Sequence, residues 1–182
     1  DYEQAVVISR EHAARDEIYD ANPGGANTMI QLKAYGEIAY EIYDELRDAP
    51  AIVSVAVSNG TTLAGIHKGF VSLYRRGKTS RVPRLVCGSS HGKNPIVLAW
   101  RKNLPECADL PPEKIKETAV NEPLINWHSI DGDQALVDPG KQTGTIERKI
   151  ERDRRICRLA HIETNQKQRI GITMQPLIRG FI

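Results

Sequence analysis

The stretch AIVSVAVSNGTTLAGIHKGF, residues 51–70, decides the fold of this chain. Its first seven residues are almost wholly apolar and rich in valine, which is typical of a parallel strand buried on both faces. The polar turn SNGTT follows at residues 58–62. Apolar residues then recur at helical spacing, at Leu63, Ile66 and Phe70. The sequence therefore predicts a buried strand, a polar loop and an amphipathic helix in direct succession.

The chain after this helix predicts a second strand, and so a parallel βαβ unit. Gly77 ends the helix, and residues 82–87 are the strand candidate. A connection of this kind between parallel strands is nearly always right-handed. Gly65 and Gly69 lie four residues apart on the helix, and we expect them to let its backbone pass close to the sheet.

Further helices are predicted before and after this unit. Residues 2–16 have an amphipathic pattern, which the Asn-Pro and Gly-Gly steps within residues 19–27 interrupt. A second helical pattern begins at Thr28 and continues to Leu46. The part after the second strand is predicted to contain a loop at 88–95 and short helices at 96–102, from Pro112 and near 133–137.

The composition is that of an ordinary soluble domain. The chain has 182 residues, of which 40% are hydrophobic and 26% charged, so a disordered tail and a collagen-like fibre are excluded. No window approaches the roughly 18 apolar residues of a membrane span, and the N-terminal DYEQAVVISREH lacks a signal-peptide pattern. We therefore expect a cytoplasmic protein without a membrane contact. The three cysteines have no paired metal-ligand spacing and are expected to be free thiols.

Basic charge gathers in the last part of the chain. Residues 141–182 hold ten basic and four acidic side chains, whereas the net charge of the whole chain is +2. Such a cluster can indicate nucleic-acid binding. Here the segment ERKIERDRRICR, residues 147–158, alternates in charge sign and has no aromatic residues on which bases would stack. A solvated helix face is therefore expected, and nucleic acid is not an expected partner.

The SNGTT loop, made of Ser58, Asn59, Gly60, Thr61 and Thr62, is the strongest candidate for a binding site. A glycine-containing turn at a helix start directs backbone N–H groups and the positive end of the helix dipole to one spot. Open α/β sheets bind ligands at this carboxyl edge of their strands. The loop has neither the GxGxxG nor the GxxxxGK pattern of nucleotide loops. Its residues alone leave two interpretations open, a phosphate-binding loop and an ordinary N-capped helix start.

Five stretches, taken in order, resemble the second part of a fold-type II pyridoxal phosphate enzyme, most of all the threonine synthase family. They are Asn22-Pro23, AYGEIAYEIYDEL at 34–46, AIVSVAVSNGTTLAGIHKGF at 51–70, RVPRLVCGSSHGKNPIV at 81–97 and KETAVNEPLINW at 116–127. In that family a turn of this kind, between strand and helix, cradles the cofactor phosphate. The resemblance therefore implies that the five residues of the SNGTT loop bind pyridoxal 5'-phosphate.

The fold that the resemblance implies is α/β, a three-layer parallel sheet with flanking helices, in part of a domain like the tryptophan synthase β subunit. Residues 1–140 then belong to the catalytic domain, and residues 141–182 form a basic, divergent C-terminal tail. The implied reaction is a lyase reaction that converts a phosphorylated amino acid, O-phosphohomoserine, to threonine. A cysteate-synthase-like enzyme using O-phosphoserine and sulfite is the alternative, because the loop does not distinguish the two substrates.

One departure from the family pattern changes what we expect of this chain. The family's cofactor-binding lysine lies upstream, in a motif resembling Ser-x-Lys-Asp, and no such motif occurs here. Lys93 lies in a different element and is not assigned that role. We expect an incomplete piece of the enzyme, inactive alone, and a homo-oligomer, because a sheet cut in mid-domain exposes strand edges. A non-catalytic anion-binding remnant is a further alternative.

Other polar residues are weaker candidates. His91 and Lys93 follow the second strand and are candidates for contact with substrate or cofactor. His67 is expected at an exposed helix position, and His128 has too few ligand partners to indicate a metal site. Residues 131–133, Asp-Gly-Asp, lack the ligand pattern of a calcium loop and are predicted to form a turn.

Overall fold

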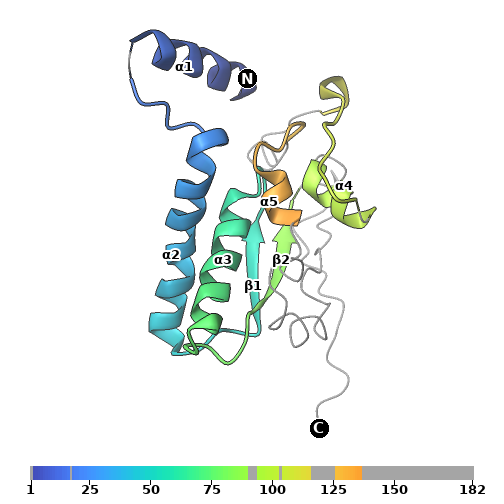
Figure 1. Ribbon diagram of the computed structural model, residues 1–182. Coiled ribbons are helices and arrows are strands. Elements are labelled where there is room, and N and C mark those ends of the chain that lie inside the picture. The colour runs from blue at the N-terminus through green and yellow to red at the C-terminus, as the bar shows by residue number, and fades with distance from the viewer. Residues whose placement is uncertain (1, 17, 90–93, 103, 116–125, 137–182) are drawn as a thin grey trace, which may run out of the picture.

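The computed structural model describes residues 2–16, 18–89, 94–102, 104–115 and 126–136. Its elements in chain order (Figure 1) are α1 (Tyr2–Asp16), η1 (Gly25–Asn27), α2 (Thr28–Leu46), β1 (Ile52–Ala56), α3 (Thr61–Arg75), β2 (Arg84–Gly88), α4 (Pro95–Arg101), η2 (Pro112–Lys114) and α5 (Gly132–Leu136). The helices and strands predicted for these residues are present, with boundaries that differ by a few residues. None of the described helices has the length and apolar character that a membrane span requires.

The two strands form a parallel sheet. Val53 of β1 pairs with Leu85 of β2, and Val55 pairs with Cys87. One step past the strand ends, the Val57 N–H donates to the Gly88 carbonyl oxygen at 2.8 Å. The prediction of an α/β fold with a parallel sheet and flanking helices is therefore confirmed.

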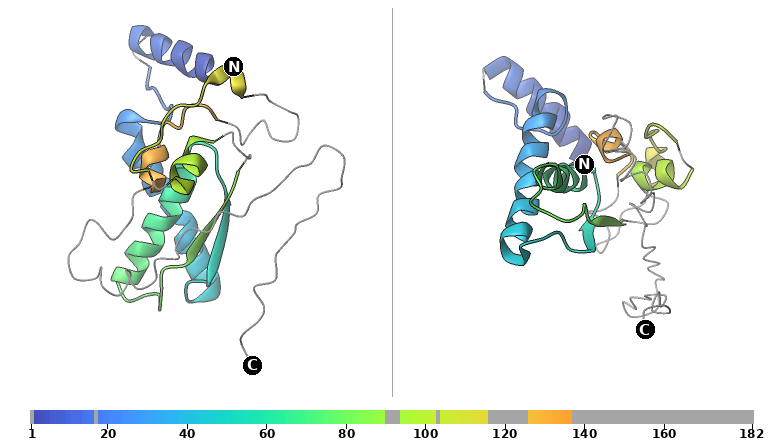
Figure 2. Two further views of the ribbon diagram at one scale, coloured as in Figure 1. Left: turned by 90° about the vertical axis from the view of Figure 1, so that its right-hand side faces the viewer. Right: turned by 60° about the horizontal axis from the view of Figure 1, so that its bottom comes forward.

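The helix α3 covers one face of this sheet, and α2 lies on the outer side of α3 (Figures 1 and 2). The core between α3 and the sheet centres on Phe70, whose side chain is fully buried. Val55, Val57 and Leu85 contribute to it from the strand side. Burying side chains of this size removes the apolar surface that drives folding, at about 1.5–3 kcal/mol for each.

The other face of β1 is open to solvent. Ile52 is 50% exposed, and Ser54 and Ala56 are exposed as well. The prediction that this strand is buried on both faces is therefore wrong for the described residues. The reason is that no described helix covers this face of β1, so its apolar side chains have no second layer to pack against.

The backbones of α2 and α3 approach each other closely. Glycine makes it possible, because Gly36 of α2 meets Gly65 and Gly69 of α3 without side chains between them. A Cβ atom at Gly65 would lie 2.9 Å from the Leu32 carbonyl oxygen, and one at Gly69 would lie 2.7 Å from the Ala39 Cβ. The glycine pair was expected to approach the sheet, and this is wrong. It faces α2, because the sheet side of α3 is occupied by larger residues such as those of the core.

Gly69→Ala tests this contact, because helix propensity and steric overlap change the free energy of unfolding in opposite directions. At an open helix position this change stabilises a protein by about 1 kcal/mol, because alanine has the higher helix propensity. At Gly69 the added methyl group meets the α2 backbone, and we expect the free energy of unfolding to fall by about 1–3 kcal/mol. Urea unfolding followed by circular dichroism measures it, with Lys68→Ala on the exposed side of α3 as the control. A stabilised Gly69→Ala chain would contradict the close contact.

Candidate anion-binding site

Three segments meet at the carboxyl edge of the parallel strands. The SNGTT loop follows β1, a second loop follows β2, and residues 126–136, which include α5, lie beside the start of α3 (Figure 1). The predicted site residues 58–62 therefore lie at the edge where open α/β sheets bind their ligands. Four residues of the second loop, 90–93, and with them the candidates His91 and Lys93, lie outside the described residues.

The SNGTT loop begins α3 without a side-chain cap. Gly60 is the N-cap residue, with φ 89° and ψ −13°, and no side chain accepts a hydrogen bond from the first turn. Its carbonyl oxygen accepts from the Ala64 N–H at 3.0 Å. Within the described residues, the N–H groups of Gly60, Thr61 and Thr62 donate no hydrogen bond. The helix start is thus capped by glycine and not by a side chain, and both interpretations left open by the sequence, a phosphate-binding loop and an ordinary N-capped helix start, stay predictions.

The backbone at Gly60 is closely covered on one side. A Cβ atom at this position would lie 2.8 Å from the Ile96 Cδ1 atom and 3.0 Å from the Ala135 Cβ. The left-handed φ and the tight packing both require glycine here. Open N–H groups at a helix N-terminus, held in place by packing, are what a phosphate group needs. The residues present therefore fit a bound phosphate.

Asn94 ties the second loop to the first. Its side chain is fully buried, and its Nδ2 donates to the Ser58 carbonyl oxygen at 2.9 Å. Its Oδ1 accepts from the Ile96 N–H at 3.0 Å and so caps α4. The Ser89 hydroxyl adds a bond to the Val57 carbonyl oxygen at 2.7 Å. The end of β1 is thereby fixed by two residues that follow β2.

Asp131 ties the third segment to two helices at once. Its carboxylate is 3% exposed and accepts the Thr28 hydroxyl at 2.7 Å and the Thr61 hydroxyl at 2.8 Å. Thr28 and Thr61 are the first residues of α2 and α3. A negative charge is favoured at a helix N-terminus by the helix dipole, and here two such ends meet on one carboxylate. The Thr61 hydroxyl is thus directed to Asp131.

The sequence analysis missed this role of Asp131. The predicted turn is present, since the Gly132 N–H donates to the Ser129 carbonyl oxygen at 3.1 Å. The carboxylate contacts, however, span 70 and 103 residues of sequence, and no local pattern marks them. The cap role of Asn94 was also missed, although Asn followed by Pro95 is a known helix-start signal.

The cysteines and His67 are further polar groups of the described residues. Burial, aided by the Asp133 carboxylate, raises the pKa of the Cys107 thiol to about 12, so that it is not a nucleophile at neutral pH. Cys87 and Cys107 are not in a disulfide, which agrees with the expected thiol form, and Cys157 lies outside the described residues. His67 is half-buried rather than exposed, which corrects the expectation for that residue. The described residues contain no group of ligands that could hold a metal ion.

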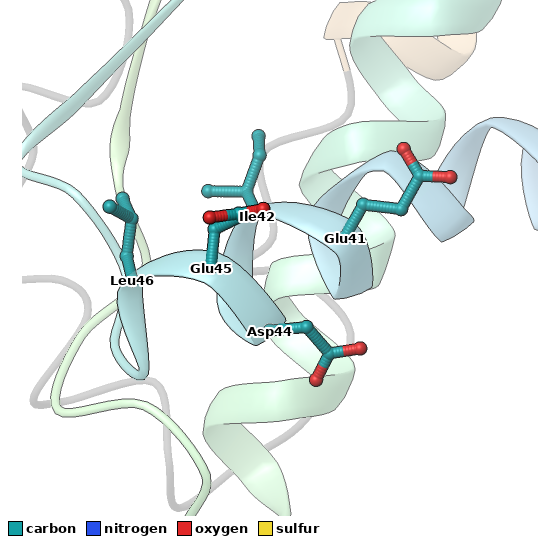
Figure 3. Close-up of a pocket in the computed structure, with 5 residues that line it drawn as sticks. All are labelled: Glu41, Ile42, Asp44, Glu45 and Leu46. Atoms are coloured by element: carbon teal, nitrogen blue, oxygen red, sulfur yellow. The ribbon is translucent and has the colours of Figure 1, made fainter.

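A separate hollow at the far end of α2 does not resemble this site. Figure 3 shows it at the C-terminal end of the helix, lined by Glu41, Ile42, Asp44, Glu45 and Leu46. Its three carboxylates repel anions. It also lies at the opposite end of α2 from Thr28, and hence away from the SNGTT loop.

Asp131→Ala tests the clamp between the helices. Removing the carboxylate leaves the buried Thr61 hydroxyl and the half-buried Thr28 hydroxyl without their acceptor, and hydrogen bonds to a charged group are each worth about 1.5–3 kcal/mol. We expect the free energy of unfolding to fall by about 3 kcal/mol. Asp109→Ala is the control, because its exposed contact with His128 is worth less than about 1 kcal/mol. Similar losses for the two variants in urea unfolding would contradict the clamp.

Comparisons with known proteins identify the family of this chain. Residues 1–138 match the family described as pyridoxal-phosphate dependent enzyme. The chain is 27% identical over 154 residues to threonine synthase 2, chloroplastic, from Arabidopsis thaliana, an alignment that covers 84% of this chain and 29% of that protein. It is also similar to the processed form of threonine deaminase isoform 2 from Solanum lycopersicum, with a TM-score of 0.46, 20% identity, and coverage of 70% of this chain and 34% of that one. The chain thus spans about a third of the length of these relatives.

Proposed function

Because this chain belongs to the family of pyridoxal-phosphate-dependent enzymes, we propose that its SNGTT loop holds the phosphate of that cofactor. The observation that carries the proposal is the start of α3, where Gly60 adopts a left-handed conformation and the following N–H groups are open. The backbone N–H groups of residues 60–62 supply the donors, and the helix dipole adds to their attraction for a dianion. Ser58 fixes the loop through its carbonyl oxygen, which accepts from Asn94.

The residues of this chain bind and orient the cofactor. When bound, pyridoxal phosphate supplies an electron sink for negative charge at the substrate α-carbon. Ile96 and Ala135 close one side of the loop at Gly60 and exclude water there. A phosphate anchored by several backbone donors on one side keeps the distant ring in one orientation. Positioning of this kind is the protein's contribution in cofactor enzymes.

The reaction that we propose for the longer enzyme is the conversion of O-phosphohomoserine to threonine by a threonine-synthase-like lyase. Its support is the similarity to a protein named threonine synthase and the loop suited to phosphate. The alternatives are a cysteate-synthase-like enzyme using O-phosphoserine and sulfite, and a non-catalytic anion-binding remnant. We further propose that this chain alone binds cofactor without turnover, because the sequence has no Ser-x-Lys-Asp motif.

Two further expectations remain proposals. We propose that the chain forms a homo-oligomer, and the open face of β1, with Ile52 half exposed, supports this because exposed apolar strands favour association. We also propose a cytoplasmic location. The assignment of residues 141–182 as a divergent tail is a prediction too, and that segment lies outside the described residues.

Gly60→Ala tests the phosphate loop. The added Cβ meets Ile96 and Ala135 and disfavours the left-handed conformation, so we expect the affinity for pyridoxal phosphate to fall at least about tenfold. Absorbance titration of the 182-residue chain measures it. Gly77→Ala is the matched control, because Gly77 is also left-handed, with φ 66°, but has open space around it at the far end of α3. Equal affinities of the two variants would contradict the assignment.

Two measurements distinguish a loss of phosphate binding from misfolding of the variant. Circular dichroism shows whether Gly60→Ala retains its helices. In the unaltered chain, inorganic phosphate should compete with pyridoxal phosphate, and pyridoxal without the phosphate should bind more weakly. A chain that binds both forms of the cofactor equally would contradict a phosphate site.

Turnover is tested on the same chain. We expect no phosphate release from O-phosphohomoserine, and no single lysine that becomes covalently labelled after borohydride reduction in the presence of pyridoxal phosphate. Labelling of one specific lysine together with turnover would contradict the proposed inactivity. Phosphate release from O-phosphoserine with sulfite, and not from O-phosphohomoserine, would favour the cysteate-synthase-like alternative.

A further inference from the structure

A second asparagine reaches the SNGTT loop from a distant part of the chain. Asn126 is 6% exposed, and its Nδ2 donates to the Oδ1 of Asn59 at 2.6 Å. The two residues are 67 positions apart in sequence. Asn59 directly precedes Gly60, so this bond acts on a side chain next to the open N–H groups of α3.

The orientation of the Asn126 amide follows from a backbone donor. The His128 N–H lies 3.1 Å from the Oδ1 of Asn126. A backbone N–H can only donate, so the atom that faces it must be the amide oxygen and not the amide nitrogen. The NH2 group of Asn126 therefore points the other way, toward Asn59. Its second hydrogen bond goes to the Ser129 hydroxyl at 3.2 Å.

The orientation of Asn59 then follows from that of Asn126. An NH2 group is a donor only, so Asn59 must meet it with its Oδ1. The Nδ2 of Asn59 keeps both of its hydrogens, since within the described residues it has no hydrogen-bond partner. The side chain is half-buried, so this donor is near the surface of the loop. A phosphate dianion only accepts hydrogen bonds, and it is attracted by an NH2 group but repelled by an amide oxygen.

We propose that Asn126 is a positioning residue that fixes the Asn59 amide, so that the NH2 group of Asn59 donates to a bound phosphate. The inference rests on the function proposed for the SNGTT loop and adds a side-chain donor to its backbone donors. It also gives the segment around Asn126 a role in ligand selectivity. Without Asn126, the Asn59 amide turns freely and presents its oxygen for part of the time.

The test compares two substitutions of Asn126 in two backgrounds. Asn126→Leu keeps the branched shape and the number of side-chain heavy atoms but makes no hydrogen bonds, and we expect it to weaken pyridoxal phosphate binding about threefold. Asn126→Asp presents an acceptor to Asn59, which turns the amide oxygen outward, and the loss is expected to be about tenfold or more. In the Asn59→Ala background, Asn126→Leu should have no further effect, because the side chain that it orients is gone. In the Asn59→Ala background, Asn126→Asp measures only the effect of the added negative charge on the affinity for pyridoxal phosphate.

The readout is the ratio of affinities for pyridoxal phosphate and for pyridoxal, measured by absorbance titration of the full 182-residue chain. A change in this ratio reports the contact with the phosphate, which a general loosening of the fold does not alter. Ser80→Ala, in the loop between α3 and β2 at the opposite end of α3 from the SNGTT loop, is the control and should leave the ratio unchanged. Circular dichroism confirms that each variant is folded.

The outcomes separate the two proposals. If the unaltered chain prefers pyridoxal phosphate and Asn126→Leu lowers this preference only when Asn59 is present, the inference holds. If Asn126→Leu acts equally with and without Asn59, or leaves the ratio unchanged, the inference is overturned while the phosphate loop stands. If the unaltered chain shows no preference for the phosphorylated form, both are overturned.

Discussion

The close contact between α2 and α3 is the constraint on which the rest of the described structure depends. Gly36, Gly65 and Gly69 let the two helices meet backbone to backbone. Figure 1 shows them running in the same direction, so their N-terminal ends lie together at the carboxyl end of the strands. Only for this reason can the hydroxyls of Thr28 and Thr61 share the carboxylate of Asp131. Close packing along the two helices thus determines how the groups at their N-terminal ends are arranged.

The same arrangement makes this end of the molecule favourable for anions. Two helix N-termini point there, and each contributes a partial positive charge. Asp131 uses that field, but its two oxygens accept hydroxyl hydrogens and not backbone N–H groups. The N–H groups at the start of α3 are therefore left for another anion, within a loop that Asn94 and Asn126 hold in place. In the proposed site, the protein's own carboxylate and a ligand phosphate would thus use different donors of the same helix end.

The sequence predicted the parts of this site that depend on local chemistry. The strand, the SNGTT turn and the helix after it were predicted, because periodicity and glycine placement act over a few residues. The direction in which Gly65 and Gly69 face was wrong, because a glycine pair permits close approach without specifying the partner. The open face of β1 was also missed, since an apolar run does not show whether a second layer is present.

The residues that hold the loop and the helix ends in place could not be predicted from local sequence patterns. Asp131 and Asn126 act across 67 to 103 residues of sequence, and neither belongs to a pattern that names its partner. Their contacts exist only after α2, α3 and the strands have packed. A functional loop can therefore be read from local sequence while the residues that orient it cannot, because orientation is a property of the tertiary structure.

The residues that hold the SNGTT loop in place also bear on the affinity of the proposed site for phosphate. A flexible loop of the same sequence pays conformational entropy when it closes around a phosphate, and its asparagine amide takes either orientation. Here the loop loses this conformational entropy when the protein folds, because Asn94 holds the backbone at Ser58. The His128 N–H fixes the amide of Asn126, which in the proposed site fixes that of Asn59. The donors are then in place before the ligand arrives. In the proposed site, affinity and selectivity for phosphate therefore depend on residues that precede α4 and α5 as much as on the SNGTT loop itself.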